Sequence, residues 1–252
     1  MARGPILIAS LAISVAFADS PGAPPAQPLK SGVEFQSADV RQMQADDFGN
    51  PGMLWVTRGE ALWREGCASC HQDAAVSMRG VAVRYPRHDA SLGGVVDLDQ
   101  RINACVARAP GGQPYAAESE PLLSLTAYVA RQSRGLPIEV ATDGPAAAVL
   151  ARGREIYLRR QGQLNLACTQ CHDASWGRTL LAETVSQGHP ADWPAYRLEW
   201  QALGSLQRRL RACYYGVRAE LPPFGSPDLV ALELYLADRA RGLVTSPPGV
   251  RK

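Results

Sequence analysis

Residues 67–71 read CASCH, and residues 168–172 read CTQCH. Both are C-x-x-C-H, the pattern at which haem c is attached to a polypeptide. Two thiols one helical turn apart can add to the two porphyrin vinyl groups, and the adjacent histidine reaches the iron from the proximal side. The pattern therefore predicts two covalently bound haem c groups. The expected attachment and axial residues are Cys67, Cys70 and His71 for haem 1, and Cys168, Cys171 and His172 for haem 2.

Two other uses of paired cysteines fit less well. A thioredoxin-like C-x-x-C needs a βαβ pattern around it, and this sequence lacks one. A structural zinc site gives no reason for a histidine directly after the second cysteine of each pair. Because the motif occurs twice in one chain, haem attachment is the favoured interpretation.

The surroundings of the two motifs are also repeated. Helical periodicity and a closing Arg-Gly-Leu recur after each motif, and the equivalent cysteines Cys105 and Cys213 are 108 residues apart. The sequence thus predicts a mainly α fold with two tandem cytochrome c-like domains related by internal duplication. The expected domains are residues 46–140 with haem 1 and residues 141–245 with a catalytic haem 2. The repeated segments read RGEALW at 58–63 and RGREIY at 152–157, then LDQRINAC at 98–105 and LQRRLRAC at 206–213.

The N-terminus has the pattern of an export signal. Arg3 precedes an apolar run at 6–13, and Ala16-Phe17-Ala18 matches a small-x-small cleavage site. A membrane anchor is the alternative, but the run is shorter than the roughly 20 apolar residues that a span needs. We expect a signal peptide at 1–18, cleaved near Ala18, and a periplasmic protein with no membrane span after cleavage.

The two ends of the mature chain are rich in proline. We expect an extended N-terminal leader at 19–45 and a flexible tail at 246–252. The formal net charge of only +2 over 252 residues argues against a nucleic-acid partner.

The distal iron ligands are less certain from the sequence. All four methionines precede residue 79, so the second half has none to offer its haem. Cys105 and Cys213 occupy equivalent places in the two repeats, which favours the same role in each, and thiolate is a good iron ligand. A disulfide between them, or two inert thiols, is the alternative. His88 and His189 have no matching counterparts and are expected at the surface or around the haem.

Arg209 stands one helical turn before Cys213, so both side chains share a helix face. A guanidinium there could hold an oxyanion such as thiosulfate through paired hydrogen bonds. The neighbouring Arg208 and Arg211 are expected to form a solvated basic face.

At these residues the sequence resembles SoxA, the multihaem subunit of the SoxAX cytochromes of sulfur-oxidising bacteria. The resemblance covers nearly the whole mature chain and is strongest at the segment QRRLRAC, residues 207–213. It implies an L-cysteine S-thiosulfotransferase that joins thiosulfate oxidatively to a cysteine of the carrier SoxYZ, with two electrons leaving through the haem of SoxX. It also implies that Cys213 is the active-site cysteine, a haem 2 ligand that can occur as a persulfide, and that Arg209 binds the substrate.

Three other functions remain open from the sequence. A thiosulfate dehydrogenase would couple two thiosulfates to tetrathionate without a carrier. A plain dihaem electron-transfer cytochrome would leave the paired Cys105 and Cys213 unexplained. A dihaem peroxidase would need an open iron site.

Overall fold

The computed structural model describes Met1 and residues 28–252. The rest of the predicted signal peptide and the leader up to residue 27 lie outside the described residues. The described part is helix-rich, in agreement with the predicted mainly α class. None of its helices is both long and apolar enough to cross a bilayer.

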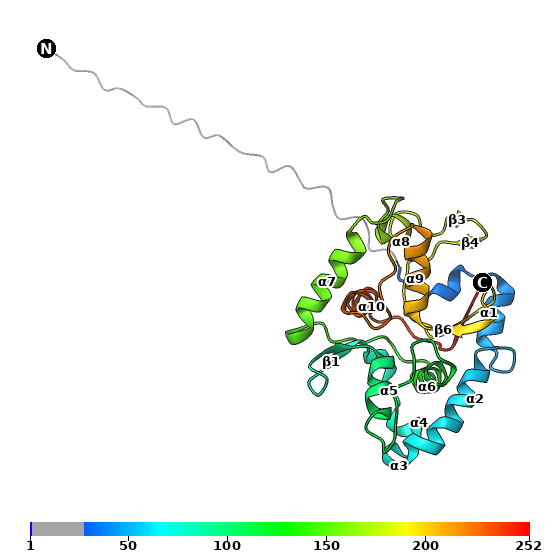
Figure 1. The fold of residues 1–252 in the computed structure, drawn as a ribbon. Helices are drawn as coiled ribbons and strands as arrows, with labels where there is room; N and C mark the ends of the chain where they lie inside the picture. Colours follow the sequence, from blue (N-terminus) through cyan, green and yellow to red (C-terminus); the bar gives the residue numbers. More distant parts are fainter. Residues whose placement is uncertain (2–27) are drawn as a thin grey trace.

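The first half of the fold, residues 46–140, is built on the pairing of helix α2 with helix α6 (Figure 1). Helix α6 buries an apolar face, and Pro121 lies in its first turn, where the missing N–H costs nothing. The elements are α2 (Met53–Leu62), a π-helical turn η2 (Trp63–Cys67), α3 (Ala68–His71), α4 (Ala74–Ser77), η3 (Ala82–Arg84), β1 (Arg87–Asp89), β2 (Gly94–Val96), α5 (Leu98–Val106) and α6 (Glu120–Arg131).

The second half, residues 141–245, pairs α7 with α10 in the same way (Figure 1). Ser226 caps α10 by accepting a hydrogen bond from the Leu229 amide, and Pro227 opens the helix. The elements are η4 (Gly144–Ala146), α7 (Ala147–Leu158), α8 (Cys168–His172), β3 (Thr179–Leu180), β4 (Glu183–Thr184), β5 (Ala195–Arg197), β6 (Ala202–Gly204), α9 (Leu206–Gly216) and α10 (Pro227–Arg239).

A glycine allows each helix pair to approach closely. A Cβ on Gly59 of α2 would lie 2.0 Å from the Ser124 carbonyl oxygen of α6, and a Cβ on Gly153 of α7 would lie 2.0 Å from the Ala231 carbonyl oxygen of α10. No side chain fits at that distance. The RG dipeptide that opens both repeated segments therefore has the same packing role in the two halves.

The two Arg-Gly-Leu segments lie against each other where the halves meet. The Gly135 amide donates to the Thr245 carbonyl, and the Gly242 amide donates to the Ile138 carbonyl. Gly135 and Gly242 both have positive φ, which places them after the helix end as the sequence predicts. Equivalent segments of the two halves thus bond reciprocally.

The predicted flexible tail is wrong. Strand β7 (Gly249–Arg251) pairs in parallel with β5, and the pair belongs to the three-stranded sheet β6-β5-β7. Arg251 is buried and donates to the Asp192 carboxylate at 2.5 Å.

The predicted leader is also not extended where it is described. It contains the short helix η1 (Gly32–Phe35) and helix α1 (Ala38–Ala45), each capped by a serine side chain. Gln44 of α1 is buried and accepts hydrogen bonds from the Val250 amide and the Arg251 guanidinium. The leader and the tail bury each other, which neither proline-rich composition alone could indicate.

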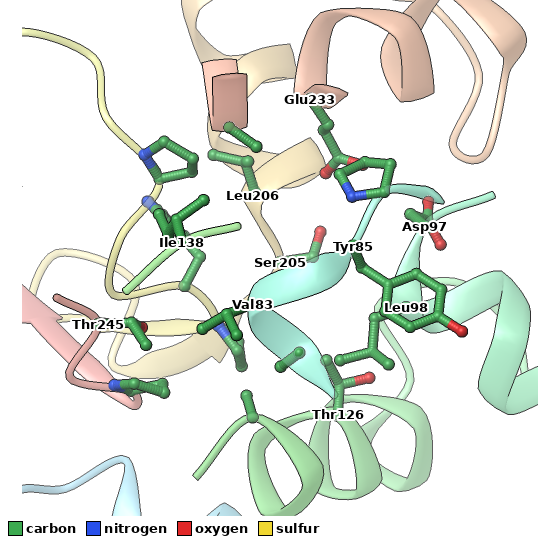
Figure 2. A pocket seen from close by; sticks show the side chains of 18 of the residues that line it. Val83, Tyr85, Asp97, Leu98, Thr126, Ile138, Ser205, Leu206, Glu233 and Thr245 are labelled. Carbon is green, nitrogen blue, oxygen red and sulfur yellow. The ribbon is translucent and has the colours of Figure 1, made fainter. Parts of the chain in front are cut away.

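A cavity of about 130 Å³ lies between the two halves (Figure 2). Asp97 and Thr126 reach it from the first half, and Ser205 and Glu233 reach it from the second. None of the six cysteines lines it. Burial raises the pKa of Asp97 to about 6, and it raises the pKa of Glu233 well above its ordinary value. Most of the lining is apolar, and the carboxyls of Asp97, Asp99 and Glu233 form a polar seam within it, separate from the predicted haem sites.

We expect Gly153→Ala to lower the free energy of unfolding by about 1–3 kcal/mol, because the new methyl group must push α7 away from α10. Urea unfolding of the protein with its haem attached measures this. Gly94→Ala is the control, since a Cβ there meets nothing within 4 Å. Equal stabilities of the two variants would contradict the close packing.

We expect Asp99→Asn to stabilise the fold more at pH 8 than at pH 4. Burial and then the charge of Asp97 raise the pKa of Asp99 to about 7, with a smaller contribution from Glu118. A carboxyl whose pKa is raised on folding contributes stability below its unfolded pKa and loses it as the pH rises through the folded pKa. The amide cannot ionise, so the variant gains on the order of 1 kcal/mol over wild type by pH 8. Thermal unfolding at both pH values checks this, with exposed Asp39→Asn as control; a gain independent of pH would contradict it.

Candidate functional site

The second C-x-x-C-H motif forms helix α8, from Cys168 to His172. The Nδ1 atom of His172 lies 2.7 Å from the Ser186 carbonyl oxygen. A carbonyl can only accept, so this contact places the ring proton on Nδ1 and leaves Nε2 with a free lone pair. The ring is thereby oriented as an axial ligand requires.

Helix α9 brings Cys213 to the same place. The Ser205 hydroxyl caps α9 by accepting from the Arg208 amide at 3.1 Å, and Cys213 lies seven residues after the first helical residue. The Cys213 side chain hydrogen bonds to His172. Burial raises the pKa of the Cys213 thiol, but Arg209 and His172 together outweigh burial and lower it to about 7.

These residues fit a covalently bound haem. The imidazole of His172 and the sulfur of Cys213 face each other from different helices, and Cys168 lies close enough to Cys213 for their charges to interact. An imidazole and a thiolate opposite one another are a known axial pair for iron, and the adjacent cysteines supply the thioether sulfurs.

Asp173, the residue directly after His172, holds helix α8 in place through three side-chain hydrogen bonds. Its carboxylate accepts from the Tyr157 hydroxyl at 2.7 Å, from the Thr169 hydroxyl at 2.6 Å and from the Arg239 guanidinium at 2.6 Å. Hydrogen bonds from these groups lower the pKa of Asp173 even though burial alone would raise it. The network ties α8 to α7 and α10, so the residue after the predicted ligand His172 is fixed.

The negative charge of Cys213 raises the pKa of Arg209, although burial alone would lower it. Arg209 also forms an ion pair with Glu183 of β4 at 3.5 Å. Arg208 stacks on the Trp200 ring at 4.2 Å, and Arg211 stacks on the Phe224 ring at 4.4 Å. Both residues are half-exposed, so one face of each guanidinium lies on an aromatic ring while the side chain still reaches solvent.

The first motif has a related arrangement. Cys67 ends η2, and α3 carries Cys70 and His71. The Trp63 ring lies 5.7 Å from the His71 ring and donates through Nε1 to the Gln72 carbonyl at 3.0 Å. Burial, and then the nearby Cys105, raise the pKa of Cys67. Cys105 lies seven residues after the start of α5, the same helix position as Cys213 in α9.

The residues that the sequence left as alternative ligands, and the alternative disulfide, can also be located in the structure. Within residues 28–252 all six cysteines are free, so Cys105 and Cys213 form no disulfide. His189 is buried, and its Nδ1 lies 2.8 Å from the Lys30 carbonyl oxygen. His88 lies in β1, half-buried. Met78 packs with Trp63 and Val129 beside the first motif.

Sequence reasoning missed two residues at this site, Arg197 and Glu183. The Arg197 side chain is only 4% exposed, and its Nη2 donates to Glu183 at 2.5 Å and to Glu199 at 2.6 Å. Arg197 could have been found from the sequence, because the 108-residue offset between Cys105 and Cys213 also relates it to Asp89, a residue of opposite charge. Glu183 has no such signal, because its hairpin has no counterpart in the first half.

Comparisons with known proteins agree on one family. The family model "SoxA/TsdA, cytochrome c domain" matches residues 53–138. The chain is 38% identical to the L-cysteine S-thiosulfotransferase subunit SoxA of Pseudaminobacter salicylatoxidans over 91% of this chain and 84% of that protein. It is 36% identical to the subunit of the same name from Paracoccus pantotrophus over 88% of this chain and 79% of that protein. The crystal structure of SoxXA from P. pantotrophus superposes with a TM-score of 0.86, covering 89% of this chain and 87% of that chain.

Proposed function

The chain belongs to the SoxA family, and we propose that it is the subunit that oxidatively conjugates thiosulfate to a cysteine of the carrier SoxYZ. The names of its relatives, L-cysteine S-thiosulfotransferase subunit SoxA, support this activity. The likeness to SoxXA supports a complex with SoxX, a smaller cytochrome that carries the electrons away. The N-terminal signal pattern supports export to the periplasm.

The proposal includes two haem c groups on two duplicated domains. Haem 1 belongs to residues 46–140, with His71 and Cys105 as axial ligands, and haem 2 to residues 141–245, with His172 and Cys213. The equal helix positions of the two distal cysteines support the duplication. So do the close glycine contacts at Gly59 and Gly153. When bound, each haem supplies a one-electron acceptor whose potential a thiolate ligand lowers.

The residues of the second half have distinct roles in the proposed reaction. Arg209 binds the sulfonate end of thiosulfate through charge-assisted hydrogen bonds, which places the sulfane sulfur beside Cys213. The carrier brings its cysteine thiol to the same sulfur. The net reaction is carrier–SH + S₂O₃²⁻ → carrier–S–S–SO₃⁻ + H⁺ + 2e⁻. An S–S bond forms, the thiol S–H bond breaks, and the two electrons leave one at a time through haem to SoxX.

One observation carries the proposal. Cys213 lies buried beside Arg209 and opposite His172, so reactive sulfur, an anion-binding group and an axial imidazole meet at one point. A plain electron carrier needs the last of these groups and not the first two. The cavity between the halves does not offer this combination, because no cysteine or methionine lines it.

We expect Cys213→Ala to abolish conjugation. The assay mixes the complex with thiosulfate, reduced SoxYZ and an electron acceptor, and reads the mass of the intact carrier. Wild type adds the thiosulfate-derived group to the carrier, and the variant adds none. Cys105→Ala is the matched control, because it changes the same helix position in the other half and retains conjugation.

Tetrathionate formed by wild type without any carrier adduct would replace the proposal with a thiosulfate dehydrogenase. Absence of both products would leave an electron-transfer cytochrome.

We expect intact-mass analysis to find two haems on the wild-type chain and one on the double variant Cys168→Ala, Cys171→Ala. Thioether bonds survive denaturation, so the mass counts the attached groups directly. The variant Cys67→Ala, Cys70→Ala is the reciprocal control and also keeps one haem. A single haem on wild type would contradict the two-haem assignment.

A further inference from the structure

Arg197 is a buried cation close to Cys213 that the proposed function does not yet use. It lies on β5, its side chain is 4% exposed, and its charge reaches Cys213. Its Nε atom is buried without a hydrogen-bond partner among the described residues. A buried donor without a partner costs about 1–3 kcal/mol, and a ligand oxygen that accepts from it would remove that cost.

The equivalent position of the first half holds the opposite charge. An offset of 108 residues relates β1 to β5, β2 to β6 and Cys105 to Cys213, and it pairs Asp89 with Arg197. In the first half Asp89 neutralises Arg101, the counterpart of Arg209, at 3.4 Å. In the second half that carboxylate is replaced by a second guanidinium. The neighbourhood of Cys213 therefore has two arginines where that of Cys105 has an ion pair.

Glu183 supplies the negative charge instead, from a different element. One carboxylate oxygen lies 2.5 Å from Arg197 Nη2, and the other lies 3.5 Å from Arg209 Nη2. The two oxygens thus span both guanidinium groups, as two oxygens of a sulfonate would. Glu199 also pairs with Arg197, at 2.6 Å, and is half exposed.

The hairpin that carries Glu183 is small. Strands β3 and β4 have two residues each, and Leu181 at the turn is 95% exposed with a positive φ. Outside the hairpin, the Lys252 ammonium donates to the Ala182 carbonyl. A carboxylate on such an element can leave its partners at lower cost than one on a packed helix.

We propose that Arg197 and Arg209 together form the sulfonate-binding cradle, and that Glu183 is a built-in competitor that thiosulfate displaces from it. This inference rests on the proposed function for the identity of the anion. Arg197 is a substrate-binding residue in this account, and Glu183 sets the affinity. Because the Glu183 carboxylate returns to the two guanidinium groups when thiosulfate leaves, no uncompensated positive charge stays buried there.

Glu183→Gln is the first test, because it keeps the size of the side chain and removes its charge. We expect the Kd of thiosulfate for the whole complex, measured by calorimetry without carrier, to fall about 10-fold, on the order of one lost charge-assisted pair. The KM for thiosulfate falls with it, while kcat changes little. An unchanged or raised Kd would overturn the role of Glu183.

Arg197→Gln tests the cradle with the opposite sign. We expect its Kd and KM for thiosulfate to rise about 10-fold or more, with the attached haem mass and the visible spectrum unchanged. If the Kd is unchanged while the spectrum or the haem 2 potential shifts, Arg197 serves a haem carboxylate and the proposal is overturned. Should Arg197→Gln fail to fold, Glu183→Gln, on the exposed hairpin, still decides it.

The first half provides matched controls. Arg101→Gln removes the counterpart of Arg209, and Asp89→Asn removes the carboxylate that pairs with Arg101. Arg101, like Arg197, has a buried nitrogen without a partner among the described residues. Neither is expected to change the Kd of thiosulfate, and a change equal to that of Arg197→Gln would overturn the proposal. Thiosulfate binding needs no carrier, so binding that depends on Arg197 in a protein that forms no adduct would sink the proposed function and leave this inference standing.

Discussion

The contact between His172 and Cys213 is the constraint on which the second half depends. An imidazole and a thiol from separate helices must face each other, so the positions of α8 and α9 are fixed relative to one another within the length of a few bonds. Asp173 fixes α8 against α7 and α10, and Ser205 fixes the start of α9 at the end of a β-hairpin. The helix pair α7–α10, brought together at Gly153, is the base from which both are held.

The first half has counterparts of two of these supports, the close glycine contact at Gly59 and the capped start of α5, but the charges near its cysteine differ. Arg101 is neutralised by Asp89, whereas Arg209 shares the carboxylate of Glu183 with Arg197. The Asp89 carboxylate has one arginine partner, whereas the Glu183 carboxylate contacts two guanidinium groups, of which that of Arg197 also pairs with Glu199. The two halves thus differ by Asp89 against Arg197 at equivalent positions and by the added β3–β4 hairpin. In the proposal above, these two differences let the second site hold a substrate anion as well as a haem.

Sequence reasoning located both cysteine motifs, the equivalent helices and the glycines that end them, because each rests on spacing within about ten residues. The helix-rich class followed from the same local periodicity. It failed for the chain ends, where the proline-rich residues before β7 and the leader with α1 bury each other across 206 residues. It did not indicate that Arg208 stacks on Trp200 and Arg211 on Phe224, since nothing local in the sequence points to these aromatic partners. Pairings that are distant in sequence and between unlike residues leave no periodic signal.

The carboxylates between the two halves set a second constraint, which acts on the site from a distance. Asp97 caps α5 and Gln207 lies in the first turn of α9, and the Gln207 amide donates to Asp97 at 2.7 Å and to Glu233 at 3.3 Å. One amide thus joins the start of the helix that carries Cys105 to the helix that carries Cys213. Two carboxylates sharing one amide group cannot both be charged cheaply in a buried seam, so at least one of them holds a proton there. Because burial raises the pKa of both carboxyls, loss of that proton at higher pH costs free energy in the seam, and the packing of α5 against α9 becomes less favourable as the pH rises.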